Sequence, residues 1–180
     1  LIKDMFEAVA SRIIEYLGTL ASFAGVGAIA LGDDMGFKTQ TMLAPAVYRE
    51  YLFPWYKKLV ETVHRYGKPI ILHACGNLKE VMGDIMECGW DAKHSFEDEI
   101  EPVWEAKEKY GSKITLLGGF DMDKISRMSE VEGRNHTRCL IEECAPGGGW
   151  TLGTGNSVAN YVPVQNFLAM LEEGYKSGKY

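Results

Sequence analysis

The sequence has 180 residues, of which 46% are hydrophobic and 24% are charged, and its formal net charge is −6 at pH 7. These proportions are typical of a globular chain that is long enough to bury its own core. An acidic chain without runs of Lys or Arg argues against nucleic acid or an anionic membrane surface as a partner. The longest apolar stretch, residues 20–31, is shorter than the roughly 20 residues that a membrane span needs.

Cysteine usage indicates the redox compartment. A chain of this size does not depend on disulfides for stability, and no secretory segment points to an oxidising compartment. We therefore predict thiols rather than disulfides, in a cytoplasmic protein, at Cys75, Cys88, Cys139 and Cys144.

Apolar residues recur with helical and strand periods in turn along the chain. Strands are predicted over residues 26–31, 69–74, 91–96, 114–119 and 149–153. Helices are predicted over residues 2–22, 46–66, 77–87, 101–110, 129–143 and 163–171. Asn77 is expected to cap the third of these helices, and Ser129 with Glu132 has the spacing of a capping box.

Alternating strands and helices predict an α/β fold with a parallel sheet and right-handed crossovers. Two architectures fit five such units. One is an open, doubly wound sheet, and the other is part of a (β/α)8 barrel, which usually needs roughly 250 residues. The periodicity leaves both open.

Polar side chains follow all five predicted strands. Ligands bind at the carboxyl ends of parallel strands, although helix N-caps favour the same residue types. The residues at these ends are Asp33, Asp34, His73, Cys75, Asn77, Glu97, Asp98, Asp121 and Asn156. We expect Asp33, His73, Cys75 and Asn156 to converge in one cavity.

The sharpest local signal is the pair His73 and Cys75. Residues two apart on a strand point to the same side, so both side chains can reach one metal ion. Imidazole and thiolate are preferred zinc ligands, but a catalytic zinc needs three protein ligands. The alternative is a buried cysteine beside a hydrogen-bonded histidine. The helical residues His64 and His136 are expected to face solvent.

Residues 69–88, PIILHACGNLKEVMGDIMEC, resemble the H-x-C-G-N segment of the uroporphyrinogen decarboxylase superfamily. The resemblance is greatest to its cobalamin-dependent branch, the methylcobalamin:coenzyme M methyltransferases. Further segments agree in order, at residues 31–36, 43–45, 95–98, 117–121 and 148–158. The resemblance implies a (β/α)8 barrel of which this chain, as one domain over residues 1–180, is the C-terminal portion. A missing N-terminal half or self-association is then expected to complete the sheet.

The resemblance also implies site roles. His73 and Cys75 match a zinc-binding pair, but Asn156 stands where the family places a further cysteine. Either another group, such as Asp33, Asp34 or Glu97, would then supply the third ligand, or zinc would bind weakly or not at all. Asp33 and Asp34 are the implied catalytic residues. The implied substrate-binding residues are Asn77, Glu97, Asp98, Asp121 and Asn156.

Three functions are compatible with this resemblance. The first is methyl transfer from methylcobalamin or a corrinoid protein to a small thiol, with zinc as cofactor. The second is uroporphyrinogen decarboxylation, which needs no metal but needs cations for the substrate carboxylates. Only Lys38, Lys93 and Lys124 lie near the predicted strand ends, and this scarcity of cations favours methyl transfer over decarboxylation. The third is a non-catalytic protein that binds a small ligand or a corrinoid protein.

Overall fold

The computed structural model describes residues 1–178. Its contacts divide the chain into two compact units, a first unit of Leu1–Lys93 and a second unit from His94 onward. Among the described residues, no helix combines the length and apolarity that crossing a membrane requires. The prediction of one domain over residues 1–180 stays a prediction.

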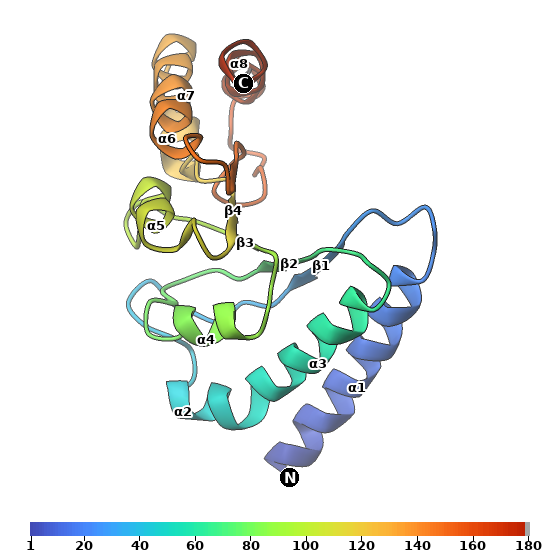
Figure 1. The fold of residues 1–180 in the computed structure, drawn as a ribbon. Helices are drawn as coiled ribbons and strands as arrows, with labels where there is room; N and C mark the ends of the chain where they lie inside the picture. The colour runs from blue at the N-terminus through green and yellow to red at the C-terminus, as the bar shows by residue number, and fades with distance from the viewer. Residues whose placement is uncertain (179–180) are drawn as a thin grey trace. The chain divides into compact units, whose positions relative to one another are not determined.

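Strands and helices alternate along both units (Figure 1). The first unit contains α1 (Ile2–Ala21), β1 (Ile29–Gly32), α2 (Pro45–Val47), the π-helical turn η1 (Tyr48–Leu52), α3 (Phe53–His64), β2 (Ile70–His73) and α4 (Met82–Glu87). Strand β3 (Ala92–His94) spans the boundary between the units. The second unit continues with α5 (Val103–Tyr110), β4 (Thr115–Leu117), α6 (Met122–Arg127), α7 (Glu130–Cys144), β5 (Trp150–Thr151) and α8 (Val164–Ser177).

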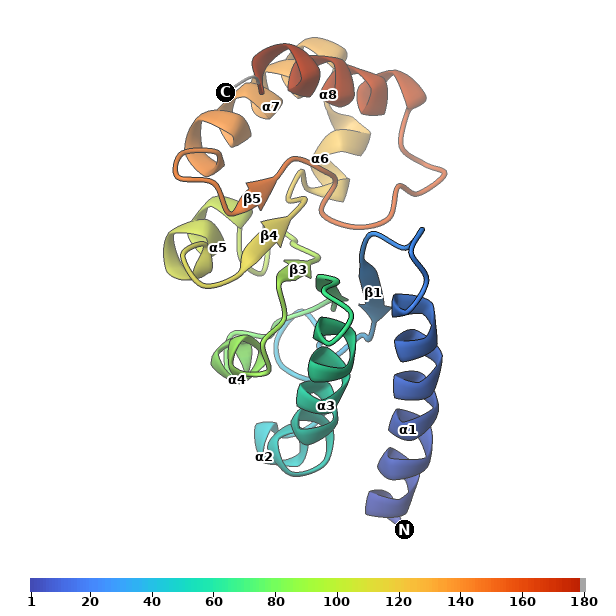
Figure 2. The same ribbon diagram turned by 45° about the vertical axis from the view of Figure 1, so that its right-hand side comes forward.

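In the first unit, β1 and β2 pair in parallel, with Ile29 opposite Ile70 and Gly32 opposite His73. Helices α1 and α3 lie side by side and run in the same direction (Figures 1 and 2). Ile70 and Leu72 of β2 are fully buried, whereas the alternate residue His73 is only half-buried. This alternation separates an apolar face, which packs against helices, from a face that carries polar side chains near the strand ends.

In the second unit, β4 and β5 also pair in parallel, with Leu116 opposite Trp150. Helices α7 and α8 lie side by side (Figure 2). Two ion pairs link these helices, Arg134 with Glu172 at 2.6 Å and Arg138 with Glu173 at 2.8 Å. Leu116 is fully buried beneath the helices of this unit, together with Val103, Ala106, Ile125, Leu140 and Met170.

All five strands overlap their predicted ranges, and the capping box of Ser129 and Glu132 is confirmed. Two helix predictions need correction, and one helix was not predicted. The predicted helix over residues 46–66 is divided by the π-helical turn, and the helix predicted from Asn77 begins only at Met82. Helix α6 was missed because its six residues are too few to show a helical period.

Asn166 of α8 supports the end of α6 from inside the second unit. Its buried Nδ2 donates hydrogen bonds to the carbonyl oxygens of Ile125 at 2.8 Å and Met128 at 2.7 Å. We predict that Asn166→Ala lowers the free energy of unfolding by about 1–3 kcal/mol, because both carbonyls lose their donor. Chemical denaturation measures this change. Asn160→Ala, at an exposed position, is the control, and equal losses in the two variants would contradict the assignment.

Candidate metal centre

The register of the first two strands decides which side chains meet beyond their ends. Gly32 and His73 are opposite each other in the parallel pair, so residues in phase with Gly32 share a face with His73. Asp34 lies two residues after Gly32, and Cys75 lies two residues after His73. The strand phase therefore directs Asp34, His73 and Cys75 to one side of the sheet.

The ligand atoms of these three side chains lie within 4.8 Å of one another. Cys75 Sγ and His73 Nε2 are 3.4 Å apart. Asp34 is exposed, whereas His73 and Cys75 are half-buried. The group is thus open to solvent on the side of the carboxylate, where a substrate could approach.

This donor set fits zinc. Bond lengths of about 2.3 Å to sulfur and 2.0–2.1 Å to nitrogen place the two atoms about 3.5 Å apart around a tetrahedral ion. The observed separation of 3.4 Å between Cys75 Sγ and His73 Nε2 matches this value. The Asp34 carboxylate lies within reach as a third ligand, and a fourth position is left for water or substrate.

Asp33 is not one of these three residues, and its expected convergence with His73 and Cys75 in one cavity stays a prediction. Its side chain lies on the opposite face of the strand, where Tyr56 of α3 donates a 2.6 Å hydrogen bond to Oδ2. Burial raises the pKa of the Asp33 carboxyl, the Tyr56 hydrogen bond lowers it, and the charge of Asp34 raises it. The backbone N–H of Asp33 donates to the His73 carbonyl at 2.8 Å, which extends the strand pairing past Gly32.

Two glycines allow the segments that follow β1 and β2 to come together. Gly76 has a φ of +87°, and a Cβ at this residue would collide with the backbone of Gly36. The backbone N–H of Asn77 donates to the Phe37 carbonyl at 2.7 Å. The Asn77 side chain donates to the Thr39 carbonyl at 3.3 Å, so Asn77 ties the two segments together instead of capping α4.

The acidic residues of the second unit form a separate arrangement. Asp121 caps α6 by accepting from the backbone N–H groups of Asp123 and Lys124, and its Oδ2 accepts from the Asp98 N–H at 3.0 Å. Lys124 Nζ lies 2.5 Å from Asp98 Oδ2. Glu97 is half-buried and begins the turn between β3 and α5. Asp98 and Asp121 thus have structural partners within their own unit, and the substrate-binding roles expected of all three stay predictions.

Asn156 lies after β5 in a segment that backbone hydrogen bonds hold in place. Gly155 accepts from the Phe96 N–H at 2.9 Å and donates to the Phe120 carbonyl at 2.7 Å. The side-chain oxygen of Asn156 accepts from the Ser157 N–H at 2.7 Å. The expected convergence of Asn156 with His73 and Cys75 stays a prediction.

The environment of His136 in α7 differs from the one that the sequence predicted. It was expected to face solvent, but its ring packs edge-on against Phe120 at 4.8 Å between centroids, and its buried Nε2 has no hydrogen-bond partner among residues 1–178. Burial lowers the pKa of His136, the charge of Lys124 lowers it further, and Asp98, Asp121 and Glu143 act in the opposite direction. Its place on a helix gave no signal of this, because the burial depends on packing against the end of β4.

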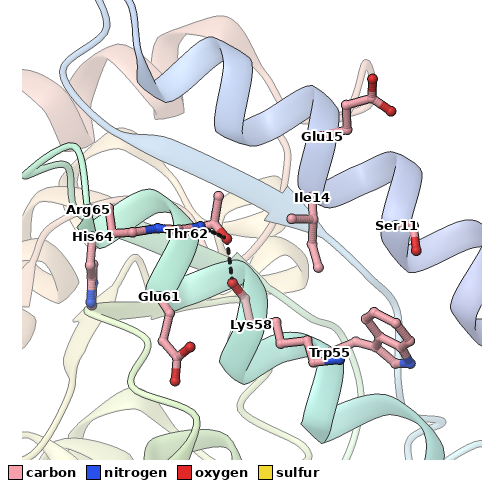
Figure 3. Close-up of a pocket in the computed structure, with 9 residues that line it drawn as sticks. All are labelled: Ser11, Ile14, Glu15, Trp55, Lys58, Glu61, Thr62, His64 and Arg65. Carbon is pink, nitrogen blue, oxygen red and sulfur yellow. Dashed lines mark hydrogen bonds between the residues drawn. The ribbon is translucent and has the colours of Figure 1, made fainter.

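A groove of about 910 Å³ lies elsewhere in the first unit, between α1 and α3 (Figure 3). Ile14 of α1 and Trp55 of α3 contribute its apolar surface, and Lys58 Nζ lies 4.0 Å from the centroid of the Trp55 ring. Neither His73 nor Cys75 lines it. The groove is thus separate from the candidate metal centre.

Residues 1–176 match the family described as Uroporphyrinogen decarboxylase (URO-D). A methylated-thiol–coenzyme M methyltransferase from Methanosarcina mazei is 26% identical over 91% of this chain and 41% of its own length. A uroporphyrinogen decarboxylase from Geobacter sulfurreducens is 26% identical, over 94% of this chain and 48% of its own length. The methylcobamide:CoM methyltransferase MtaA from Methanosarcina barkeri is 24% identical, over 93% and 48% respectively.

A solved structure of a methyltransferase from Methanosarcina mazei shares the fold. It aligns with a TM-score of 0.70 and 20% identity, over 92% of this chain and 48% of that one. The predicted α/β fold, a portion of the (β/α)8 barrel, is confirmed by this likeness and the family match. The chain spans about half the length of the curated relatives that it matches.

We predict that Gly76→Ala weakens metal binding at Asp34, His73 and Cys75 by at least about tenfold, because the new Cβ separates the two segments that carry the ligands. Isothermal titration with zinc measures the effect. Gly83→Ala is the control, since it lies in α4 with no atom near its added Cβ. Unchanged zinc affinity in a folded Gly76→Ala variant would show that this contact does not shape the site.

His136 makes stability depend on pH. Because its pKa is lowered in the folded chain, the unfolded chain takes up a proton near pH 6.5 that the folded chain does not, and stability falls as the pH drops below that value. We predict that His136→Gln reduces this fall, by no more than about 1.4 kcal/mol per pH unit. Urea denaturation between pH 7 and pH 5 tests this. Cys139→Ser, exposed on the same helix, should keep the wild-type slope.

Proposed function

Because the chain belongs to the uroporphyrinogen decarboxylase family, we propose that it forms the metal-binding part of a corrinoid-dependent methyltransferase that passes a methyl group to a small thiol. The observation that carries this proposal is the cluster of Asp34, His73 and Cys75. A cysteine and a histidine at a separation that suits zinc support a role in activating a thiol, which a metal-free decarboxylation would not require.

The three side chains would hold zinc as two anionic ligands and one neutral ligand. The charges of the Cys75 thiolate and the Asp34 carboxylate balance the divalent ion, while His73 binds as neutral imidazole. Bound zinc would lower the pKa of an acceptor thiol, so that the thiolate, the reactive form, is present at neutral pH. Asp34 in this scheme supplies the negative charge that a second cysteine would otherwise supply.

The rest of the reaction would depend on the substrates that this chain brings together. A methylated corrinoid would supply an electrophilic methyl group, and the acceptor thiolate would supply the electron pair for the new bond from sulfur to carbon. The relatives named methylated-thiol–coenzyme M methyltransferase and methylcobamide:CoM methyltransferase support this class of donor and acceptor. Methylcobalamin or a corrinoid protein is thus the proposed donor.

Uroporphyrinogen decarboxylation is the second candidate, and a relative of that name at 26% identity favours it. Its substrate carboxylates need cationic partners at the strand ends. Lys124 is paired with Asp98, and the centre itself carries Asp34 and Cys75, which add negative charge. This distribution of charge supports methyl transfer over decarboxylation.

Metal content tests the proposal. We predict that the purified chain, dialysed against zinc at pH 7.5, retains one zinc ion, and that Cys75→Ala and His73→Ala each bind it at least about tenfold more weakly. Asp34→Asn should weaken binding less, because an amide oxygen keeps the position but not the charge. Binding should also decrease as the pH falls and Cys75 becomes protonated.

Cys139→Ala removes an exposed cysteine outside the cluster and should leave the zinc content unchanged. Zinc that persists in both His73→Ala and Cys75→Ala would contradict the centre. With the remainder of the family fold supplied, zinc-dependent methylation of a thiol by methylcobalamin would support the reaction. Loss of carboxyl groups from uroporphyrinogen without zinc would instead establish the decarboxylase.

A further inference from the structure

An apolar cavity of about 280 Å³ lies in the first unit on the helix side of β1. Most of its lining is apolar and comes from α1, η1 and α3, including Phe6, Ala10, Ile13, Leu52, Trp55 and Leu59. Asp33 and Tyr56 are the only polar side chains among its lining residues. A concave apolar site with a few convergent polar groups is the usual form of a small-molecule site.

The two polar side chains are arranged to receive a hydrogen-bond donor. Tyr56 donates to Asp33 Oδ2 at 2.6 Å, and both residues line the cavity. Tyr56 is itself held by an edge-on contact with Trp90, with 5.1 Å between ring centroids. Among the described residues, the hydrogen bond shown to the Asp33 carboxylate comes from Tyr56 and reaches Oδ2. The other oxygen, Oδ1, can therefore accept a hydrogen bond from a ligand.

The charge around the cavity favours a cation. Asp33 is followed directly by Asp34, so this strand end carries two carboxylates. A carboxylate that faces apolar surface is best complemented by an ammonium group, which both donates a hydrogen bond and offsets the charge.

The groove of Figure 3 offers an approach to the cavity. Ile14 and Trp55 line both hollows, so the groove and the cavity adjoin at these two side chains. In Figure 3 both residues lie between α1 and α3, with the Trp55 ring directed towards α1. Movement of two side chains would therefore open a path without displacing either helix.

We propose that this cavity binds a compact apolar primary amine, with its body among the side chains of α1 and α3 and its ammonium group on Asp33. The volume lies near the lower end of the roughly 300–1,000 Å³ of ligand pockets, which suits one ring with a short chain. None of Asp34, His73 and Cys75 lines the cavity, so this site is distinct from the candidate metal centre and does not rest on its function.

Calorimetric titration of the full chain with 2-phenylethylamine tests the proposal, with 2-phenylethanol as the uncharged probe of similar shape. The amine should bind at least about tenfold more tightly than the alcohol. Asp33→Asn should remove most of this preference. Absence of amine binding to the folded wild-type chain, or an equal preference in Asp33→Asn, would overturn the proposal.

Two further variants keep the test informative if Asp33→Asn does not fold. Ala10→Phe places a ring in the cavity and should abolish binding of both probes, whereas Ala8→Phe adds the same ring at an exposed position outside the lining and should not. Amine binding that survives in Ala10→Phe would place the ligand elsewhere and refute the site.

Discussion

The pairing of Gly32 with His73 is the constraint on which the candidate metal centre depends. Side chains alternate along a strand, so a shift of one residue in this register would exchange the two faces of β1 relative to β2. With the observed register, Asp34 shares a face with His73 and Cys75, and Asp33 faces the helices. Two adjacent carboxylates therefore have different surroundings, Asp34 beside His73 and Cys75 and Asp33 beside Tyr56.

Close approach of backbone to backbone completes the centre. The segments after β1 and β2 meet at Gly36 and Gly76, where neither residue has room for a side chain. The hydrogen bond from the Asn77 N–H to the Phe37 carbonyl then holds the segments together. Ligands that are preorganised in this way lose less conformational freedom when a metal binds, which raises affinity without any additional contact.

The second unit uses its polar residues differently. Asp121 caps α6 and anchors the Asp98 backbone, while Lys124 neutralises the Asp98 carboxylate. The Nε2 of His136 is buried beside this group, and within the described part of the chain it has no hydrogen-bond partner. Polar groups at the strand ends of this unit thus order the turns around β4, and Lys124 offsets the charge of Asp98. The cluster at the ends of β1 and β2, by contrast, is left open to solvent on the side of Asp34.

The sequence by itself determined the alternation of strands and helices and the shared face of His73 and Cys75, because both follow from periods within a single segment. It also determined the cap at Ser129, which involves neighbours three residues apart. Only the tertiary structure gave Asp33 and Asp34 different surroundings, since these depend on the register between two strands distant in sequence. It likewise decided the burial of His136 and the cavity beneath α1, because both arise where separate elements pack together. A local sequence pattern does not specify which distant residues will be in contact.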